Sequence, residues 1–492
     1  MKNHIRSYKQ LIAAHIAGLL LLCTVGCKNA IDVGPPINKL SSVTVFTSNG
    51  TAEAAVSGIF GTMASSSGKM YNGSSSVSLL QGQAADELVS YSTTSAFYPN
   101  SLTSQSPYYW PEIYQEMFDI NSAITALNNN GSTLTPAIRN QLLGEVKFAR
   151  AFIYFYAVNL YGDVPMPLTN DYLANNTLSR TPQQEVYAQV IQDLKDAQLL
   201  LPDNTYLSGT GTTSVDRVQP NKQAAMAMLA RVYLYQKDWA NAQTMATAVI
   251  NASSYKLEAI NSVFLKASQE AIWQLFPVTA GLNNADAQYL VITARPTTTS
   301  SQLSLNTNLL NAFEPGDGRL ANWVGSYVAP AVGALPATTY QFAYKYKVNV
   351  VNSANPVTEY PVMLRLAEQY LIRAEAYIQT NQIALGIADL NTIRTRARLA
   401  STVAIPNPLP ALSATLSLSD AIDAVAHERQ VELFSEMGHR WFDLRRTGKI
   451  DAVMTVVTPQ KGGTWATTKQ LVPLPASEII LNSNLTQNPG YN

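Results

Sequence analysis

The only two cysteines of this 492-residue chain, Cys23 and Cys27, stand four residues apart in LLLLCTVGCKNA. Two thiols at such a spacing could form a disulfide, bind a metal ion, act as a redox pair or mark a processing site. The residues around them distinguish these uses. The pair lies on the flank of the most apolar run of the chain, which favours processing.

The N-terminus has the features of an export signal. Lys2, Arg6 and Lys9 precede the apolar run LIAAHIAGLLLLCTV (11–25), which is too short to span a bilayer. In TVGC the small residue Gly26 stands directly before Cys27, as in a lipoprotein signal peptide. We expect cleavage after residue 26, loss of Cys23 and lipidation of Cys27. The mature protein would then hold no free thiol, no disulfide and no cysteine-based zinc site.

No catalytic motif is complete in the sequence. HERQVE (427–432) begins like a zinc-protease motif, but Val431 stands where the second histidine is needed. GTGTT (209–213) lacks the lysine of a phosphate-binding loop, and no G-x-S-x-G is present. Beyond the signal peptide only His427 and His439 remain, which leaves little for a histidine-based metal site or a Ser-His-Asp triad. We therefore expect a protein that is not an enzyme.

The segment HERQVELFSEMGHRWFDLRRTGK (427–449) is densely charged and aromatic at once. We interpret it as structural, with Trp441 and Phe442 in the core. Its charged side chains are expected to form a partly buried ion-pair network: Arg429, Glu432, Arg440, Asp443, Arg445 and Arg446.

Aromatic residues in polar segments are the better candidates for binding. Sugars are recognised when their apolar faces stack on aromatic rings while amides and carboxylates bond their hydroxyls. YSTTSAFYPN and NWVGSY combine these residue types, and we extend the set to an aspartate and a further tyrosine. The predicted ligand-binding residues are Asp86, Tyr91, Phe97, Tyr98, Asn100, Tyr289, Trp323 and Tyr327. The alternative is that each ring is buried in a local core.

The composition fits an uncharged polar ligand. Hydrophobic residues make up 47% of the chain, charged residues only 13%, and tyrosine is abundant at 25. Lys plus Arg equals Asp plus Glu at 33 each, so the basic excess that nucleic acid binding requires is missing.

The elements that would carry these residues are mainly helices. In NQLLGEVKFARAFIYFYAVNLYGDVP, apolar residues recur every three or four positions from Leu142 to Leu160, and Gly162 ends the run. Residues 224–250 and 366–393 repeat a pattern of small residue, tyrosine, turn and small residue, which is typical of tetratricopeptide helix pairs. Residues 68–109 and 253–360, rich in Ser, Thr, Asn, Gly and Pro, are expected to be loops and short strands. The predicted fold class is mainly α: a tetratricopeptide-like helical-pair scaffold with an inserted loop-rich subdomain containing short strands.

Segments along nearly the whole chain resemble the SusD/RagB family of outer-membrane nutrient-binding lipoproteins. The similar segments, in the order of the family, are WPEIYQEMFDINSAI (110–124), KFARAFIYFYAVNLYGDVPMP (147–167), RTPQQEVYAQVIQDLKDAQLLLP (180–202), AAMAMLARVYLYQKDWANA (224–242), LRLAEQYLIRAEAYI (364–378), ERQVELFSEMGHRWFDLRRTG (428–448) and LVPLPASEIILNSNLTQNPGY (471–491). The resemblance implies a signal peptide (1–26), a lipidated tether (27–45) and a nutrient-binding domain (46–492).

It further implies non-catalytic binding of an oligosaccharide or polysaccharide and its delivery to a SusC-like TonB-dependent transporter. The protein would be lipid-anchored in the outer membrane and face the extracellular side. A structural calcium ion is the one cofactor left open. Two alternatives remain: peptide cargo bound by the same architecture, or a structural protein that docks on the transporter without a cargo site. A third alternative is a glycoside hydrolase, and release of reducing sugar would support it.

Overall fold

The computed structural model describes residues 45–65, 69–129 and 133–491, and Phe46–Asn492 form one compact unit. The predicted signal peptide, Cys27 and the tether up to residue 44 lie outside the described residues. Among the helices of the described part, none combines the length and the apolar character needed to cross a bilayer.

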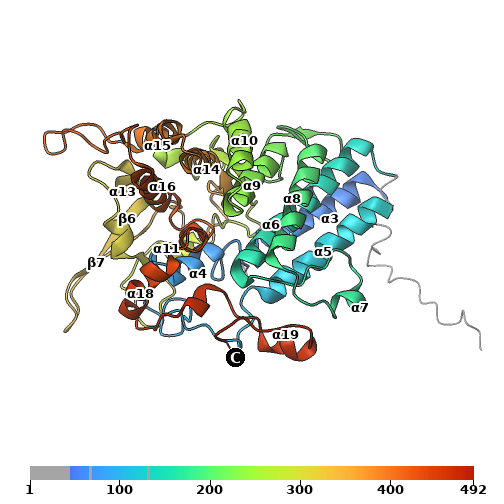
Figure 1. The fold of residues 1–492 in the computed structure, drawn as a ribbon, viewed down its shortest axis with the longest axis horizontal. Helices are drawn as coiled ribbons and strands as arrows, with labels where there is room; N and C mark the ends of the chain where they lie inside the picture. The colour runs from blue at the N-terminus through green and yellow to red at the C-terminus, as the bar shows by residue number, and fades with distance from the viewer. Residues whose placement is uncertain (1–44, 66–68, 130–132, 492) are drawn as a thin grey trace, which may run out of the picture. The chain divides into compact units, whose positions relative to one another are not determined.

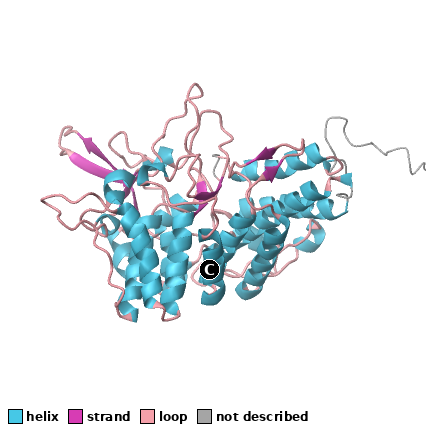
Figure 2. Cartoon of the chain, turned by 90° about the horizontal axis from the view of Figure 1, so that it is seen from above, coloured by secondary structure: helices cyan, strands magenta, loops and turns pink. Residues whose placement is uncertain are grey.

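A row of packed helices forms the main part of this unit, which confirms the predicted mainly-α fold class (Figures 1 and 2). Neighbours along the row pack in the order α6, α8, α9, α10, α14 and α15, while α3 and α5 lie against α6, and α16 lies against α14 and α15. The helices of this scaffold are α3 (Asn49–Met63), α5 (Trp110–Asn129), α6 (Pro136–Tyr161), α8 (Gln183–Leu200), α9 (Lys222–Tyr235), α10 (Trp239–Ile250), α14 (Leu366–Gln379), α15 (Ile383–Ala397) and α16 (Leu418–Leu433).

The predicted seam of α6 is buried along its whole length, from Leu142 to Leu160. Pro136 stands at the first helical position, where its missing N–H costs nothing. Gly162 ends the helix with φ +74°, a backbone conformation that glycine adopts without strain. The sequence pattern therefore predicts both the buried face and the end of this helix correctly.

Both predicted repeats form antiparallel helix pairs, α9 with α10 and α14 with α15. The small residue of the second pair is required sterically, because a Cβ at Gly386 would lie 2.6 Å from Ile378 and 2.7 Å from the carbonyl of Ala374. The tight turns are alike too. Lys237 and Asn381 each have a positive φ four residues after the repeat tyrosine.

Shorter elements cover one side of the scaffold. The strands form antiparallel pairs, β1 with β5, β2 with β3, β4 with β8 and β6 with β7. They are β1 (Leu88–Ser90), β2 (Tyr206–Leu207), β3 (Thr213–Ser214), β4 (Ala271–Gln274), β5 (Leu303–Leu305), β6 (Val324–Ala329), β7 (Thr338–Ala343) and β8 (Val362–Arg365). The short helices are α4 (Val77–Ala84), α7 (Tyr172–Asn175), η2 (Ile260–Ser262), α11 (Ala287–Leu290), α12 (Thr307–Leu310), α13 (Gly318–Trp323), α17 (His439–Arg446), α18 (Ile450–Gln460), η3 (Thr467–Gln470) and α19 (Ala476–Leu481).

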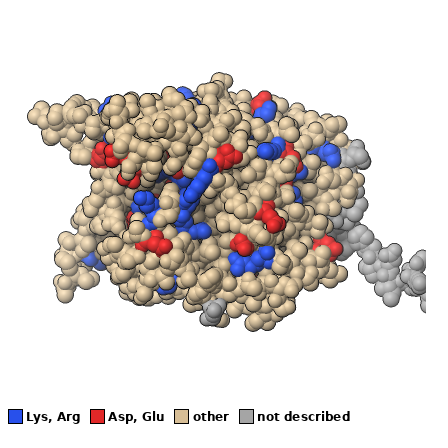
Figure 3. All heavy atoms as spheres, viewed as in Figure 1, with Lys and Arg blue, Asp and Glu red and all other residues tan. Residues whose placement is uncertain are grey.

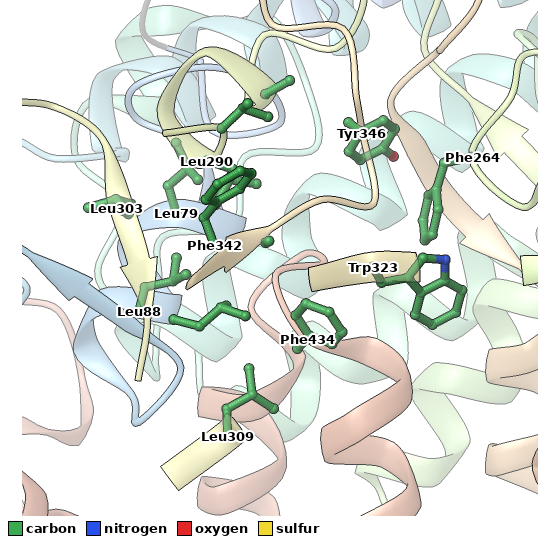
Figure 4. Close-up of a cluster of buried hydrophobic side chains, with 14 of the residues drawn as sticks. Leu79, Leu88, Phe264, Leu290, Leu303, Leu309, Trp323, Phe342, Tyr346 and Phe434 are labelled. Atoms are coloured by element: carbon green, nitrogen blue, oxygen red, sulfur yellow. The ribbon is translucent and has the colours of Figure 1, made fainter. Parts of the chain in front are cut away.

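A core cluster of apolar side chains joins the strand-containing part to α16 and the turn that follows it (Figure 4). Leu88, Leu303, Phe342 and Trp323 come from the strands and α13, and Phe434 comes from the turn after α16. These rings and branched side chains share one hydrophobic core, so the loop-rich part is fixed to the helical scaffold by hydrophobic burial.

Buried ion pairs cross the same boundary. Arg319 of α13, fully buried, lies 2.6 Å from Glu428 and 2.9 Å from Glu432, both of α16. Arg365 of β8 pairs with Glu432 at 2.7 Å and with Glu436 at 2.7 Å. Opposite charges out of water attract strongly when every charge is paired, so the two parts are held in one geometry.

Candidate functional site

Tyrosine side chains from three separate segments meet on the surface of the strand-containing part. Tyr91 follows β1, and Tyr340 of β7 contacts it with ring centroids 5.6 Å apart in an edge-to-face arrangement. Tyr327 of β6 stands directly opposite Tyr340 in the antiparallel register of the hairpin. All three rings are partly exposed. We call Tyr91, Tyr98, Tyr327 and Tyr340 the tyrosine cluster.

Local bonds fix the position of Tyr91. Its hydroxyl lies 2.7 Å from the hydroxyl of Ser304, and β1 and β5 pair so that Ser90 lies opposite Leu303. The alternation of a strand then directs Leu88 and Leu303 to the core in Figure 4. Tyr91 is therefore anchored at the phenol end while the residue as a whole remains partly exposed.

The hairpin that carries Tyr327 and Tyr340 is tied to a neighbouring loop. The guanidinium of Arg295 donates hydrogen bonds of 2.8 Å to the carbonyls of Pro330 and Pro336, at the ends of β6 and β7. The N–H of Thr93 donates to the carbonyl of Thr298, which links the Tyr91 segment to that loop. These bonds hold the three segments of the tyrosine cluster together.

Tyr98 completes the cluster beside a buried cation. The Lys461 ammonium lies 5.4 Å from the centroid of the Tyr98 ring and donates to the carbonyls of Gln83, Ala84 and Ala85 at 2.8–2.9 Å. Burial lowers the pKa of Lys461 to about 7. Burial also raises the pKa of Tyr98, with a smaller contribution from Tyr91.

The cluster presents neutral hydrogen-bonding groups next to aromatic faces. Burial raises the pKa of Tyr91 as well, against the opposing effect of its hydrogen bond with Ser304, so both phenols stay protonated at neutral pH and can donate and accept. Exposed hydroxyls of Thr93, Thr94 and Thr299 lie on the segments that flank the cluster. Such a surface suits the alternating apolar faces and hydroxyls of a sugar.

The structure separates the eight predicted residues into two groups. Tyr91, Tyr98 and Tyr327 lie in the tyrosine cluster, and Tyr289 of α11 packs partly exposed against the core cluster below it. Tyr340 was missed. The segments VGSYVA and TTYQFA could have indicated it, because they are typical of two strands of a hairpin. Strands of equal length around one turn place residues 327 and 340 opposite each other.

The other four predicted residues are interior, and the prediction needs correction for them. Trp323 is 1% exposed and donates its indole N–H to the carbonyl of Ile260. Phe97 is buried against the rings of Tyr108 and Tyr109. Asp86 pairs with Arg440 at 2.7 Å.

Asn100, the fourth, is buried and donates to the carbonyl of Ala84. It lines, with Phe97, a hollow of about 10 Å³, which is the size of one water molecule and too small for a sugar. In all four cases the side chain has an internal partner that occupies its binding atoms or faces, and none is retained as a ligand contact.

His427 and Glu428 of the segment HERQVE make internal contacts in this fold. His427 of α16 places Nε2 2.7 Å from the carbonyl of Ala312, and Glu428 is buried against Arg319 and Arg394. The described residues contain no group of three or more His, Cys, Asp or Glu side chains placed to hold a metal ion.

The predicted ion-pair network of residues 427–449 is confirmed. Arg429 and Arg446 both contact Asp443 at 2.7 Å, and Trp441 and Phe442 are buried. Arg445 differs, because its guanidinium donates to the backbone carbonyl of Asn159 rather than to a carboxylate.

Comparison with known proteins agrees with this architecture. The family model described as "SusD family" matches residues 278–491, and the SusD-like model "Starch-binding associating with outer membrane" matches residues 43–234. SusD-like protein P2 of Formosa agariphila is 27% identical over 96% of this chain and 98% of its own length. Starch-binding protein SusD of Bacteroides thetaiotaomicron is 33% identical over 29% of this chain and 23% of its own length.

Solved structures share the fold. A SusD superfamily protein from Bacteroides vulgatus matches with a TM-score of 0.74 and 20% identity, covering 91% of this chain and all of the other. A laminarin-binding SusD-like protein matches with a TM-score of 0.70 and 22% identity over 89% of this chain and 99% of the other. At the level of the family, the named ligands are carbohydrates and the named location is the outer membrane. With a SusD family model matching residues 278–491, a SusD-like model matching residues 43–234 and a SusD-like relative aligned over 96% of the chain, this is a SusD-like protein.

Proposed function

We propose that this protein binds an oligosaccharide or polysaccharide on the tyrosine cluster, without catalysis, and delivers it to a SusC-like TonB-dependent transporter. The observation that carries the proposal is the convergence of Tyr91, Tyr98, Tyr327 and Tyr340 from three segments onto one partly exposed surface. Tyr91 is fixed at its phenol end by Ser304 and packs edge-to-face on Tyr340, and partly exposed rings held in this way are suited to stacking against a sugar.

The remaining parts of the proposal follow from the N-terminus and the family. Lipidation of Cys27 would tether the protein to the outer membrane, with the tyrosine cluster facing the extracellular side. Support comes from the signal-peptide pattern and from the outer-membrane association in the family description. A transporter that imports the cargo requires release, so micromolar to millimolar affinity is expected, about −8 to −4 kcal/mol.

Calorimetric titration of residues 28–492 tests the cargo. Soluble oligosaccharides derived from starch and from laminarin, a panel of other plant, microbial and host glycans, and an unrelated peptide mixture serve as ligands. Saturable heat with one class of glycan is expected. Saturation by peptides alone would replace glycan with peptide as the cargo, and silence with a folded protein would support a docking role without a cargo site.

Substitution of the cluster tests the site. Tyr91→Ala and Tyr340→Ala should each weaken binding of the responding glycan roughly 2- to 10-fold, because one aromatic platform contributes about 0.5–1.5 kcal/mol. Tyr172→Ala is the matched control, since Tyr172 is 62% exposed and lies on α7, away from β6 and β7 in Figure 1. An equal loss in the control, or none in the cluster variants, would contradict this site.

A further inference from the structure

A cavity of about 560 Å³ opens in the helical scaffold, and it shares no lining residue with the tyrosine cluster. Its walls come from the turn between α9 and α10 and from α14, α16, α17 and α18. Figure 3 shows a hollow on this face, with Lys and Arg side chains gathered along it where Figure 1 draws α14 and α16. The volume is within the range of pockets that enclose a small molecule.

Guanidinium groups form the polar wall of this cavity. Arg429, Arg440 and Arg446 all line it, and each is held in place by a bond to a carboxylate: Arg429 to Asp443, Arg440 to Asp86, and Arg446 to Glu375. Salt-bridged arginines have little rotational freedom, so their free N–H groups are fixed before any ligand arrives.

One of these groups has an unused donor. Arg429 is 2% exposed, and its Nε and Nη2 donate to Asp443. Its Nη1 is buried and has no hydrogen-bond partner among the described residues. A buried charged N–H without an acceptor is unfavourable, and a carboxylate oxygen is the strongest acceptor for a guanidinium group.

The charge around the cavity also favours an anion. Five cationic side chains line it against three carboxylates, Glu375, Asp423 and Asp443. Lys237 and Lys449 are exposed and take part in no salt bridge within the part of the chain that the structure describes. A concave, low-dielectric wall with an excess of one sign concentrates the field inside it.

Apolar side chains line the cavity as well. Trp239 of α10 is partly exposed and lines the cavity together with Ile422, Val425, Leu444 and Val453. An indole ring is a good surface for stacking a flat ring or the apolar face of a sugar. A ligand that satisfies both the cationic and the apolar side chains therefore carries a carboxylate on a ring-shaped body.

We propose that this cavity binds a small ring-bearing carboxylate, with the carboxylate toward Arg429 and Lys449 and the ring against Trp239. Two sources share this chemistry, a sugar acid and an aromatic acid. This second site is independent of the tyrosine cluster and does not rest on the proposed function.

Calorimetric titration of residues 28–492 with glucuronate and with benzoate tests the proposal, with glucose and benzyl alcohol as neutral counterparts. Saturable binding of at least one acid is expected, with the neutral counterpart at least 10-fold weaker. Raising the salt from 50 to 500 mM should weaken binding of the acid, since the lysines are exposed. Glucuronate alone would identify a sugar acid, and benzoate alone an aromatic acid. Equal binding of the neutral compounds, or saturation by none, would overturn the proposal.

Variants locate the bound acid. Lys449→Gln and Trp239→Ala should each weaken it about 3- to 10-fold, with unchanged circular dichroism as the check on folding. Lys195→Gln, on the exposed face of α8, is the matched control and should bind normally. The double variant Tyr91→Ala/Tyr340→Ala should also bind the acid normally. Loss of binding in either of these, with no loss in the Lys449 and Trp239 variants, would refute a site in the cavity.

Discussion

Lys461 shows how a single residue positions the candidate site. It follows α18, yet its ammonium donates to three successive carbonyls at the end of α4 and just after it, ahead of the strand that leads to Tyr91. In its protonated form the tetrahedral nitrogen has three donors for three carbonyls, and these bonds then fix the path of this backbone. The same ammonium lies near the Tyr98 ring. One side chain thus contributes to the placement of two tyrosines.

His439 at the start of α17 makes a pH-dependent contribution to stability that can be measured. It is 5% exposed, its Nε2 lies 3.9 Å from Glu368, and its Nδ1 has no partner among the described residues. Burial, together with the nearby Arg231 and Arg429, lowers the pKa of His439 to about 4, against the opposing effect of Glu368 and Asp443. The unfolded chain therefore binds more protons than the folded one between pH 4 and pH 6.5, and stability is lost as the pH falls through this window.

We expect His439→Gln to reduce this pH dependence by up to roughly 3 kcal/mol between pH 4 and pH 6.5. Urea unfolding at half-unit pH steps gives the free energies. His427→Gln, which changes a histidine bonded to a backbone carbonyl, is the control and should keep the slope of the unchanged protein. A slope that survives in His439→Gln would mean that other groups carry it.

At the scale of the element, helix pairs depend on small residues at their crossings. Gly386 of α15 sits against Ile378 and the carbonyl of Ala374 in α14. Gly58 of α3 has no atom within 4 Å of the place where a Cβ would stand. The same residue type therefore meets opposite environments in two helices.

Alanine substitution at these two glycines should change stability in opposite directions. Gly386→Ala forces the helices apart and should lower the free energy of unfolding by about 1–3 kcal/mol. Gly58→Ala should raise it by roughly 0.5–1 kcal/mol, because alanine loses less conformational freedom in a helix. Chemical denaturation followed by circular dichroism measures both. A stabilising Gly386→Ala would show that α14 and α15 do not pack as closely as described.

The elements could be predicted from the sequence because their signals are local. The apolar period of α6, the glycine that ends it and the small-residue repeats of α9–α10 and α14–α15 all act within a few residues. Which residues lie in the candidate site, and which are interior, depends on contacts between segments that are distant in the sequence. Trp323 and Tyr327 are four residues apart, but only Trp323 contacts Phe264 and Ile260. The residues next to it in the sequence do not indicate that contact.

At the scale of the whole molecule, the loop-rich part and the helical scaffold share a core and an ion-pair network. Arg319 contacts Asp317, Glu428 and Glu432 while fully buried. Removing one member of such a network leaves buried charges without partners, which costs about 3–5 kcal/mol.

Residues 46–492 should accordingly unfold in one transition. Tryptophan fluorescence and far-UV circular dichroism should give the same urea midpoint, and Arg319→Met should lower both midpoints together. The matched control is Arg139→Met on α6, whose guanidinium donates to a single carbonyl and which should shift the midpoint little. Separate midpoints for the two probes would show that the loop-rich part unfolds independently.

The segment before Tyr91 is held by side chains that are synthesised much later than the segment itself. Asp86 is bonded by Arg440, 354 residues later, and the carbonyls of residues 83–85 accept hydrogen bonds from Lys461. Ribosomes add about 5–20 residues per second, so roughly 20 to 70 seconds separate the synthesis of Asp86 from that of Arg440. During that interval the strand and loop that hold Tyr91 and Tyr98 lack the side chains that fix them. The segment that carries Tyr91 and Tyr98 is therefore synthesised early, but the side chains that fix it are synthesised near the end of the chain.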